Sequence, residues 1–300
     1  MSAPRLTVYV AYHSTPVAPL PERPPYLAVC NVRPDGSRPP GFTAYDDEGG
    51  LPHSNAAYNE LSVLHRLQER ADTELVGLSH YRRTLLARRP TGRRGEQPGT
   101  VHVSGWDWRS PERWAGDEAS LVAAMDGLDW ATPRPFDVRR AGYRSLWEHF
   151  SGNHPEELLR RAGVAVSAQH PGLESLGDYL RRETTTPLYS VFLGRRELLH
   201  RYGAFLWPVL AACGSGLELA GYQGRWAGFV AERLHGYWLA HLARPAGVRV
   251  GALPLGLLDV ALPPRRQRLT GILPAPVSLA LLRGSHRAQS MAGAGVRRRP

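Results

Sequence analysis

The chain has 300 residues, enough for one large α/β domain or two closely packed lobes. Its composition, 42% hydrophobic and 21% charged, is globular, and no apolar stretch approaches the roughly 20 residues that span a bilayer. The net charge is +10, and every one of the 37 cationic residues is arginine. These arginines are scattered rather than gathered in a basic stripe interleaved with aromatic residues, which disfavours a nucleic-acid-binding protein.

The cysteines and the N-terminus bear on the compartment. Cys30 and Cys213 lie far apart without metal-ligand spacing, which argues against a disulfide framework and is typical of a reducing cytoplasm. The N-terminus leads directly into a strand-like segment, so we expect no signal peptide. The sequence therefore favours a cytoplasmic protein.

The N-terminal half alternates buried strands with helices. Residues 6–11 (LTVYVA) and 74–78 (ELVGL) have the continuous apolar pattern of parallel strands. Ser54 or Asn55 can cap a helix that continues to about residue 71. Residues 88–99 are polar and basic, and we expect them to be mobile.

The C-terminal half is predicted to be largely helical, with one more clear strand. That strand is residues 188–193 (LYSVFL), and a shorter strand-like piece covers 129–131. The predicted helices cover residues 120–128, a region around 143–150, 155–162, 173–182, 196–211 and 228–242. We expect one catalytic α/β domain over 1–262 and a poorly ordered tail over 263–300, rich in Arg, Gly, Pro and Ala.

Strands that alternate with helices indicate an α/β sheet, in which ligands bind beyond the carboxyl ends of the strands. Two predicted strands end in clusters of histidine and tyrosine, at Tyr12-His13 and at His80-Tyr81. We therefore place the candidate site at these ends.

The segment from His80 to Arg83 offers an imidazole, a phenol and two guanidinium groups directly after a buried strand. Such groups could neutralise a departing diphosphate, alone or with a metal ion that His80 ligates. In the alternative interpretation the arginines are solvated and His80 caps a loop.

Two further groups of acidic residues are candidates. Asp46 and Asp47 lie in a glycine-flanked loop and suit a hard cation or sugar hydroxyls, although Asp and Gly are also common turn residues. Glu232 lies near the edge of the apolar face of the 228–242 helix. It could ligate a metal, act as a base or stabilise charge at an anomeric carbon, or form a structural ion pair with an arginine.

The sequence lacks the glycine-rich fingerprints that bind phosphates. It has no G-x-G-x-x-G after a strand, no P-loop, no G-x-S-x-G and no H-E-x-x-H, so we expect neither NAD nor flavin.

Taken in order, several segments resemble an uncharacterised-domain family that is grouped with bacterial capsular-polysaccharide glycosyltransferases. The matching segments are residues 8–13, Asp46-Asp47, 55–61, 76–83, and Arg225 with 228–234. The resemblance covers about residues 6–255 and implies a GT-A-like, Rossmann-related, mostly parallel sheet flanked by helices, with a helical C-terminal half. The chain departs from the family pattern at Ser190-Val191, where relatives tend to have Asn-Met, and at 49–52, where they have Gly-Asp-Asn.

The resemblance also implies roles for individual residues. The catalytic candidates are His80, Asp47 and Glu232. The candidates for binding the nucleotide sugar are Tyr12, His13, Glu60, Tyr81, Arg82, Arg83 and Arg233. The candidate ligands of a divalent cation, Mg²⁺ or Mn²⁺, are His80, Asp46 and Asp47.

Three functions are compatible with the sequence. Some relatives look like flavin-free mutases that interconvert pyranose and furanose forms of a GDP-hexose in antibiotic or saccharide biosynthesis, and we favour this reaction slightly. The alternative is a glycosyltransferase with a GDP- or UDP-sugar donor. A non-catalytic binder of nucleotide sugars or of polyanions is the third. Both enzymes have a nucleotide sugar as partner, we expect neither a nucleic-acid partner nor a membrane span, and a homodimer is left open.

Overall fold

The computed structural model describes residues 5–12, 20–21, 23–30, 42–44, 58, 60–88, 93–94, 100–102, 108–217, 219 and 221–257. The predicted tail, 263–300, and most of the predicted polar segment, 88–99, lie outside these residues.

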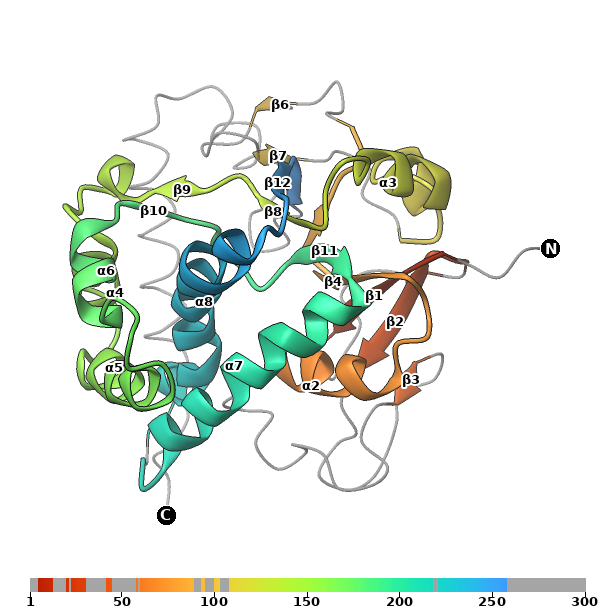
Figure 1. Cartoon of the computed structure of the whole chain (residues 1–300). Helices are drawn as coiled ribbons and strands as arrows, with labels where there is room; N and C mark the ends of the chain where they lie inside the picture. Colours follow the sequence, from red (N-terminus) through yellow and green to blue (C-terminus); the bar gives the residue numbers. More distant parts are fainter. Residues whose placement is uncertain are drawn as a thin grey trace, which may run out of the picture.

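The centre of the molecule is a mixed sheet of 11 strands, with a separate two-stranded sheet beside it (Figure 1). The strands of the large sheet are β1 (Leu6–Tyr12), β2 (Tyr26–Cys30), β3 (Thr43–Ala44), β4 (Leu75–His80), β5 (Arg83–Leu85), β6 (Arg93–Arg94), β7 (Thr100–His102), β8 (Trp130–Pro133), β11 (Phe192–Arg195), β12 (Val250–Leu253) and β13 (Leu255–Leu257). The small sheet pairs β9 (Phe136–Asp137) with β10 (Thr185–Thr186).

The strand pairings place several carboxyl ends at one edge of the sheet. β1 is parallel to both β2 and β4. β11 is antiparallel to β4 and to β8, and β12 is parallel to β8. β1, β2, β4, β8 and β12 therefore all run in one direction, and the start of antiparallel β11 lies at the edge where these strands end.

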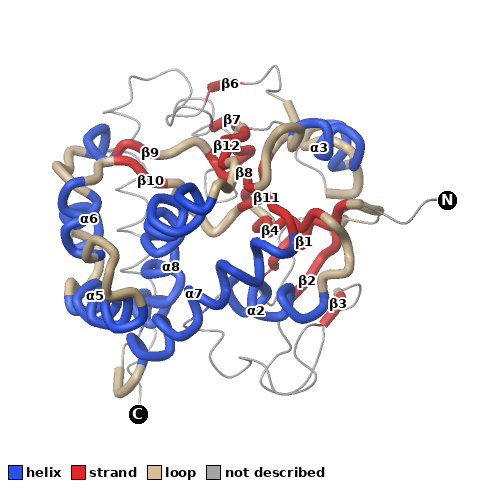
Figure 2. Tube along the Cα trace, viewed as in Figure 1, coloured by secondary structure: helices blue, strands red, loops and turns tan. Residues whose placement is uncertain are grey.

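Helices cover both faces of the sheet and build most of the C-terminal half (Figures 1 and 2). They are α2 (Glu60–Arg70), α3 (Glu118–Ala124), α4 (Leu146–Ser151), α5 (Glu157–Gln169), α6 (Leu176–Arg182), α7 (Arg196–Gly214) and α8 (Trp226–Trp238), which continues into a π-helical turn at Leu239–Ala243. The architecture confirms the predicted helix-flanked α/β sheet with a helical C-terminal half. In the described part of the chain, no helix combines the length and the apolarity needed to cross a bilayer.

The alternation of side chains along β1 explains why the sheet needs helices on both faces. Tyr9 and Ala11 belong to the core formed with α2, α7 and α8. Val8, Val10 and Tyr12 belong to the other core, which includes residues of α3. Because successive strand residues point to opposite faces, a strand with apolar residues on both faces must be covered on both sides.

The predicted start of the strand 188–193 is wrong. The observed strand, β11, begins at Phe192, and the residues before it turn away from the sheet. Tyr189 has a φ of 69°, which no strand residue adopts, and the amide of Val191 donates to the carbonyl oxygen of Tyr189 at 2.7 Å. The apolar pattern predicted burial here but carried no signal for this turn. It also gave no prediction for β2.

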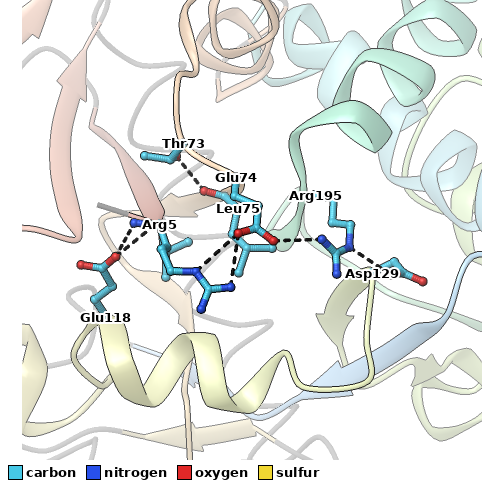
Figure 3. Close-up of polar contacts among 8 residues, drawn as sticks. Arg5, Thr73, Glu74, Leu75, Glu118, Asp129 and Arg195 are labelled. Atoms are coloured by element: carbon cyan, nitrogen blue, oxygen red, sulfur yellow. Dashed lines mark hydrogen bonds and ion pairs between the residues drawn. The ribbon is translucent and has the colours of Figure 1, made fainter. Parts of the chain in front are cut away.

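At the edge where the parallel strands begin, charged residues form a chain of ion pairs (Figure 3). Arg5, Glu74, Asp129 and Arg249 each stand one residue before a strand, namely β1, β4, β8 and β12. Arg195, the last residue of antiparallel β11, joins two of them, donating to Glu74 at 3.0 Å and to Asp129 at 3.1 Å. The chain of ion pairs therefore ties strand starts that are far apart in the sequence.

Replacing Asp129 with asparagine is expected to lower the free energy of unfolding by about 2 kcal/mol at pH 7, because Asp129 accepts charge-assisted hydrogen bonds. The Arg249 side chain donates to it at 2.8 and 2.9 Å, and this contact, followed by that of Arg195, lowers the pKa of Asp129. Because the pKa of Asp129 is lower in the folded protein, its carboxylate stabilises the fold at pH values above the pKa of the unfolded state. This contribution is lost in strong acid, so the wild type and Asp129→Asn should have the same stability there. Urea unfolding measures the difference, with Asp126→Asn, at an exposed position, as the control. Equal stabilities at pH 7 would contradict the assignment.

Replacing Gly194 with alanine is expected to cost about 3 kcal/mol of stability, because its Cβ would overlap the ring of Trp130, lying only 2.6 Å from Cζ3. That ring cannot move easily, since it stacks on Phe192 at 4.4 Å and its Nε1 donates to His235 at 3.1 Å. Gly163→Ala is the matched control, because a Cβ there meets nothing within 4 Å and favours helix α5. Thermal melts of the two variants should shift in opposite directions.

Candidate functional site

The predicted cluster after β4 forms a tight turn at the carboxyl edge of the sheet. β4 ends at His80, Tyr81 and Arg82 make the turn, and Arg83 begins β5 opposite His80. The neighbouring strand β1 ends at Tyr12, with Ala11 in register with His80. The two strand ends at which the candidate site was predicted therefore lie side by side at one edge of the sheet.

Buried hydrogen bonds hold this turn in place. The Nε1 of Trp108, a fully buried side chain, donates to the carbonyl oxygen of Tyr81 at 2.9 Å. The amide of Tyr81 donates to the carbonyl of Ala11 at 3.0 Å. The hydroxyls of Ser79 and Thr84 hydrogen bond across the hairpin at 2.7 Å. The turn is thus anchored from three sides, which fixes the backbone that presents the two arginines.

His80 lies beneath the turn rather than on the surface, with an exposed fraction of 4%. Its Nδ1 lies 3.2 Å from the amide nitrogen of Arg82 and accepts that hydrogen bond. A neutral imidazole whose Nδ1 accepts carries its proton on Nε2. In this tautomer Nε2 is a hydrogen-bond donor, whereas a metal ligand on Nε2 would need Nδ1 to be the donor.

Aromatic rings pack around the turn. Tyr12 stacks on Tyr81 at 5.5 Å between ring centroids and contacts the edge of Phe42 at 5.2 Å. The guanidinium of Arg82 lies over Tyr81 at 5.3 Å. Burial raises the pKa of Tyr12, so its phenol stays protonated. A role for Tyr12 in binding a nucleotide base stays a prediction.

A second group joins the site from α8 and from the segment before β11. The amide of Tyr189 donates to Oε1 of Glu232 at 3.2 Å. The ring of the same tyrosine carries the guanidinium of Arg83 at 4.1 Å. Residues before β11 reach this place because Phe192 is in register with Leu78, two residues before β4 ends. Tyr189 therefore links the carboxylate of α8 to the arginine of β5.

The charge state of Glu232 depends on four neighbours. Burial raises the pKa of its carboxyl group; Arg233 lowers it, Glu60 raises it, and Arg83 and the Tyr189 amide lower it. Its Oε2 accepts from Nη1 of Arg233 at 2.9 Å. A partly desolvated carboxylate with a raised pKa beside a cation is a common arrangement for acid–base or electrostatic catalysis.

Arg233 extends the site into the core. Its side chain is 3% exposed, and its Nη2 lies 2.8 Å from Nδ1 of His149. Burial, followed by the charge of Arg233, lowers the pKa of His149 to about 3, so the imidazole is neutral and accepts this hydrogen bond. The ion-pair interpretation of Glu232 is confirmed, with Arg233 as the partner. This does not exclude a role in chemistry, because Glu232 keeps its second oxygen towards Tyr189.

The structure tests only part of the predicted metal site. His13, Asp46 and Asp47 lie outside the described residues. Among the side chains that are described, no group of three or more His, Cys, Asp or Glu could hold a metal ion. Because His80 by itself presents a donor tautomer, a cation site would depend on the two aspartates.

A shallow hollow lies beside Tyr189 at the same edge. Its lining residues are Thr100, Pro133, Arg134, Phe136, Leu188, Tyr189 and Leu255. It combines aromatic, aliphatic and guanidinium groups next to the residue that touches both Glu232 and Arg83.

Sequence reasoning missed three residues of this site: Trp108, His149 and Tyr189. Trp108 and His149 act through partners that are 27 and 84 residues away, and no local pattern reveals such pairs. Tyr189 falls within a predicted strand, although the neighbouring Ser190 departs from the family pattern.

The comparisons with known proteins agree with this fold. The sequence matches the family described as "Domain of unknown function (DUF4422)" over residues 7–243. No curated protein matches it significantly. The structure is similar to the apo structure of WbbM, a bifunctional glycosyltransferase, with a TM-score of 0.76 and 18% identity. The match covers 86% of this chain and 47% of that one, so this chain spans about half of its length.

Proposed function

The chain belongs to the DUF4422 family, and from this premise we propose that it is an enzyme that breaks the bond between a sugar's anomeric carbon and a nucleoside diphosphate. We further propose glycosyl transfer as the reaction. The observation that carries the proposal is that Glu232 and Arg83 meet through Tyr189 at the carboxyl edge of the sheet, in a fold similar to that of a glycosyltransferase.

The chemistry assigns each group a task. As the C1–O bond to the diphosphate breaks, the diphosphate takes the bonding electrons, and Arg82 and Arg83 offset the charge that develops on it. A hydroxyl of the acceptor forms the new bond to C1, and its proton passes to Glu232, whose raised pKa suits a base. Arg233 and the amide of Tyr189 orient the carboxylate.

A divalent cation, Mg²⁺ or Mn²⁺, remains part of the proposal, with Asp46 and Asp47 as its ligands, because the hydrogen bond that Nδ1 of His80 accepts leaves its Nε2 a donor rather than a metal ligand. When bound, it would supply further positive charge against the diphosphate. Full activity in protein stripped with a chelator would remove this part of the proposal and leave the charge on the diphosphate to Arg82 and Arg83.

The mutase stays the second candidate, supported by the sequence resemblance alone. In that reaction the diphosphate leaves C1 and another hydroxyl of the same sugar bonds to C1. The diphosphate then rejoins C1 as the original ring C1–O bond breaks, and the released ring oxygen takes up the proton, so no acceptor is consumed.

One assay separates the reactions. The protein is incubated with a panel of GDP- and UDP-hexoses and Mg²⁺ or Mn²⁺, with and without saccharide acceptors, and the products are followed by ion-exchange chromatography and NMR. A new glycoside with release of nucleoside diphosphate supports transfer, whereas a new sugar-nucleotide isomer of unchanged mass without acceptor identifies the mutase. Binding without turnover would indicate the non-catalytic binder, and no binding would contradict all three.

A further inference from the structure

Tyr189 combines three features that a packing residue does not need. Among the described residues it is the one non-glycine with a positive φ, at 69°. Its amide donates to Glu232 at 3.2 Å, and its ring lies under Arg83 at 4.1 Å. A bulky side chain in this conformation is strained, and such strain persists where the surroundings impose it, commonly at functional sites.

The strain and the contacts have one geometric origin. The left-handed conformation turns the chain back before β11, and the amide of Val191 closes this turn on the carbonyl of Tyr189 at 2.7 Å. Glycine would adopt this φ without cost, yet it would offer no ring to Arg83. A tyrosine at this position therefore has a more strained backbone than a glycine would have, but it provides the aromatic ring that contacts Arg83.

We propose that Tyr189 is a positioning residue that holds Arg83 and Glu232 in a fixed relation, its ring supporting the guanidinium and its amide the carboxylate. The inference rests on the proposed function, because it assigns these two groups to the leaving diphosphate and to the base. A cation over an aromatic face is held without losing its charge, so Arg83 stays available to a phosphate.

The coupling also sets the charge on Glu232. The charged and titratable groups that act on this carboxyl are Arg233 on its own helix, Glu60 of α2, Arg83 of β5 and Tyr202 of α7. Of these, Arg83 alone rests on Tyr189. Removal of the ring would release the Arg83 side chain. Its positive charge would then no longer be held near Glu232, and the pKa of Glu232 would rise.

Three substitutions separate the ring from the backbone. Tyr189→Phe keeps the ring and the amide. Tyr189→Gly keeps the amide, relieves the backbone and removes the ring. Tyr189→Ala removes the ring and keeps the strain. Tyr222→Ala, which removes an exposed tyrosine whose ring packs on Phe229 and not on Arg83, is the control.

We expect Tyr189→Gly to melt at a higher temperature than Tyr189→Ala, because glycine adopts the positive φ without strain. Both variants should nevertheless bind nucleoside diphosphate about tenfold more weakly in calorimetry, as expected for a lost cation–π contact that orients a phosphate ligand. Tyr189→Phe should restore both affinity and turnover. A glycine variant that binds the diphosphate as tightly as the wild type would overturn the proposal.

A second measurement needs no substrate. In protein labelled with ¹³C at glutamate carboxyl groups, the Glu232 resonance is assigned by its absence in Glu232→Gln and titrated with pH. Its pKa should rise in Tyr189→Gly and Tyr189→Ala and stay at the wild-type value in Tyr189→Phe. An unchanged pKa in the glycine variant would refute the coupling. If the wild type binds no nucleotide at all, the proposed function fails, and this titration still decides whether Tyr189 couples the two groups.

Discussion

Replacing Glu232 with glutamine is expected to lower kcat for sugar transfer by about 10³-fold, within the range that a positioned acid or base contributes. Glutamine keeps an oxygen for the Tyr189 amide and a similar shape, but it cannot take up the acceptor's proton. The affinity for nucleoside diphosphate should fall much less, because Arg82 and Arg83 are unchanged. Initial rates with the substrate pair found by the product assay, together with calorimetry, separate the two effects.

The control for this result is Glu197→Gln, which removes an exposed carboxylate from α7. Glu232→Gln also removes the partner of a buried arginine, so its unfolding must be measured alongside its activity. A folded Glu232→Gln protein that retains a tenth or more of wild-type turnover would show that Glu232 is only the structural partner of Arg233.

The protein is expected to lose stability steeply as the pH falls from about 6.5 towards 4, because three histidines, the buried His235 and the half-buried His149 and His154, are neutral in the fold. Burial lowers the pKa of His149 and of His235 to about 3 and that of His154 to about 4. Between these values and the unfolded value near 6.5, the unfolded chain binds more protons than the folded one. Stability therefore rises with pH across this window, by up to about 1.4 kcal/mol per pH unit for each histidine.

Glu232 opposes this trend in part. Its raised pKa means that the folded protein takes up a proton there before the unfolded chain does, which favours the fold as the pH falls towards 4.5. Denaturant unfolding at several pH values measures the net slope. His235→Gln keeps an acceptor for Trp130 and should reduce the slope by about a third, whereas His200→Gln, at an exposed position, should not change it. A stability that is constant between pH 7 and 4.5 would contradict the burial of these imidazoles.

The fold was predictable where burial alone decides the structure. The apolar runs at β1 and β4 predicted two buried strands, and the structure pairs these strands in parallel along six residues. The helical spacing at α7 outweighed Pro208, which lies inside the observed helix. Short strands such as β5 and β13 escaped prediction, because two or three residues carry no periodic pattern.

The sequence predicted the edge of the sheet at which the candidate site lies, but not the geometry of the site. Ligands bind beyond the carboxyl ends of parallel strands, so the sequence alone was enough to place the candidate site at Tyr12 and His80; the structure adds that the two strands are neighbours. That Glu232 would reach the same edge depends on the path of α8 and on the turn at Tyr189. Position 189 is a tyrosine, which does not favour a positive φ, so long-range contacts must impose this turn.

The ion pairs at the strand starts have a consequence for how long the folded state lasts. They join residues that are 66 to 121 positions apart: Asp129–Arg195 at 66, Arg5–Glu74 at 69, Asp129–Arg249 at 120 and Glu74–Arg195 at 121. We expect these contacts to form after the transition state of folding, because closing loops of this length costs entropy before the ion pairs can offset it. Interactions absent from the transition state slow unfolding and leave the folding rate unchanged. The edge farthest from the candidate site should therefore govern the lifetime of the native protein and its resistance to proteases that require a fully opened chain.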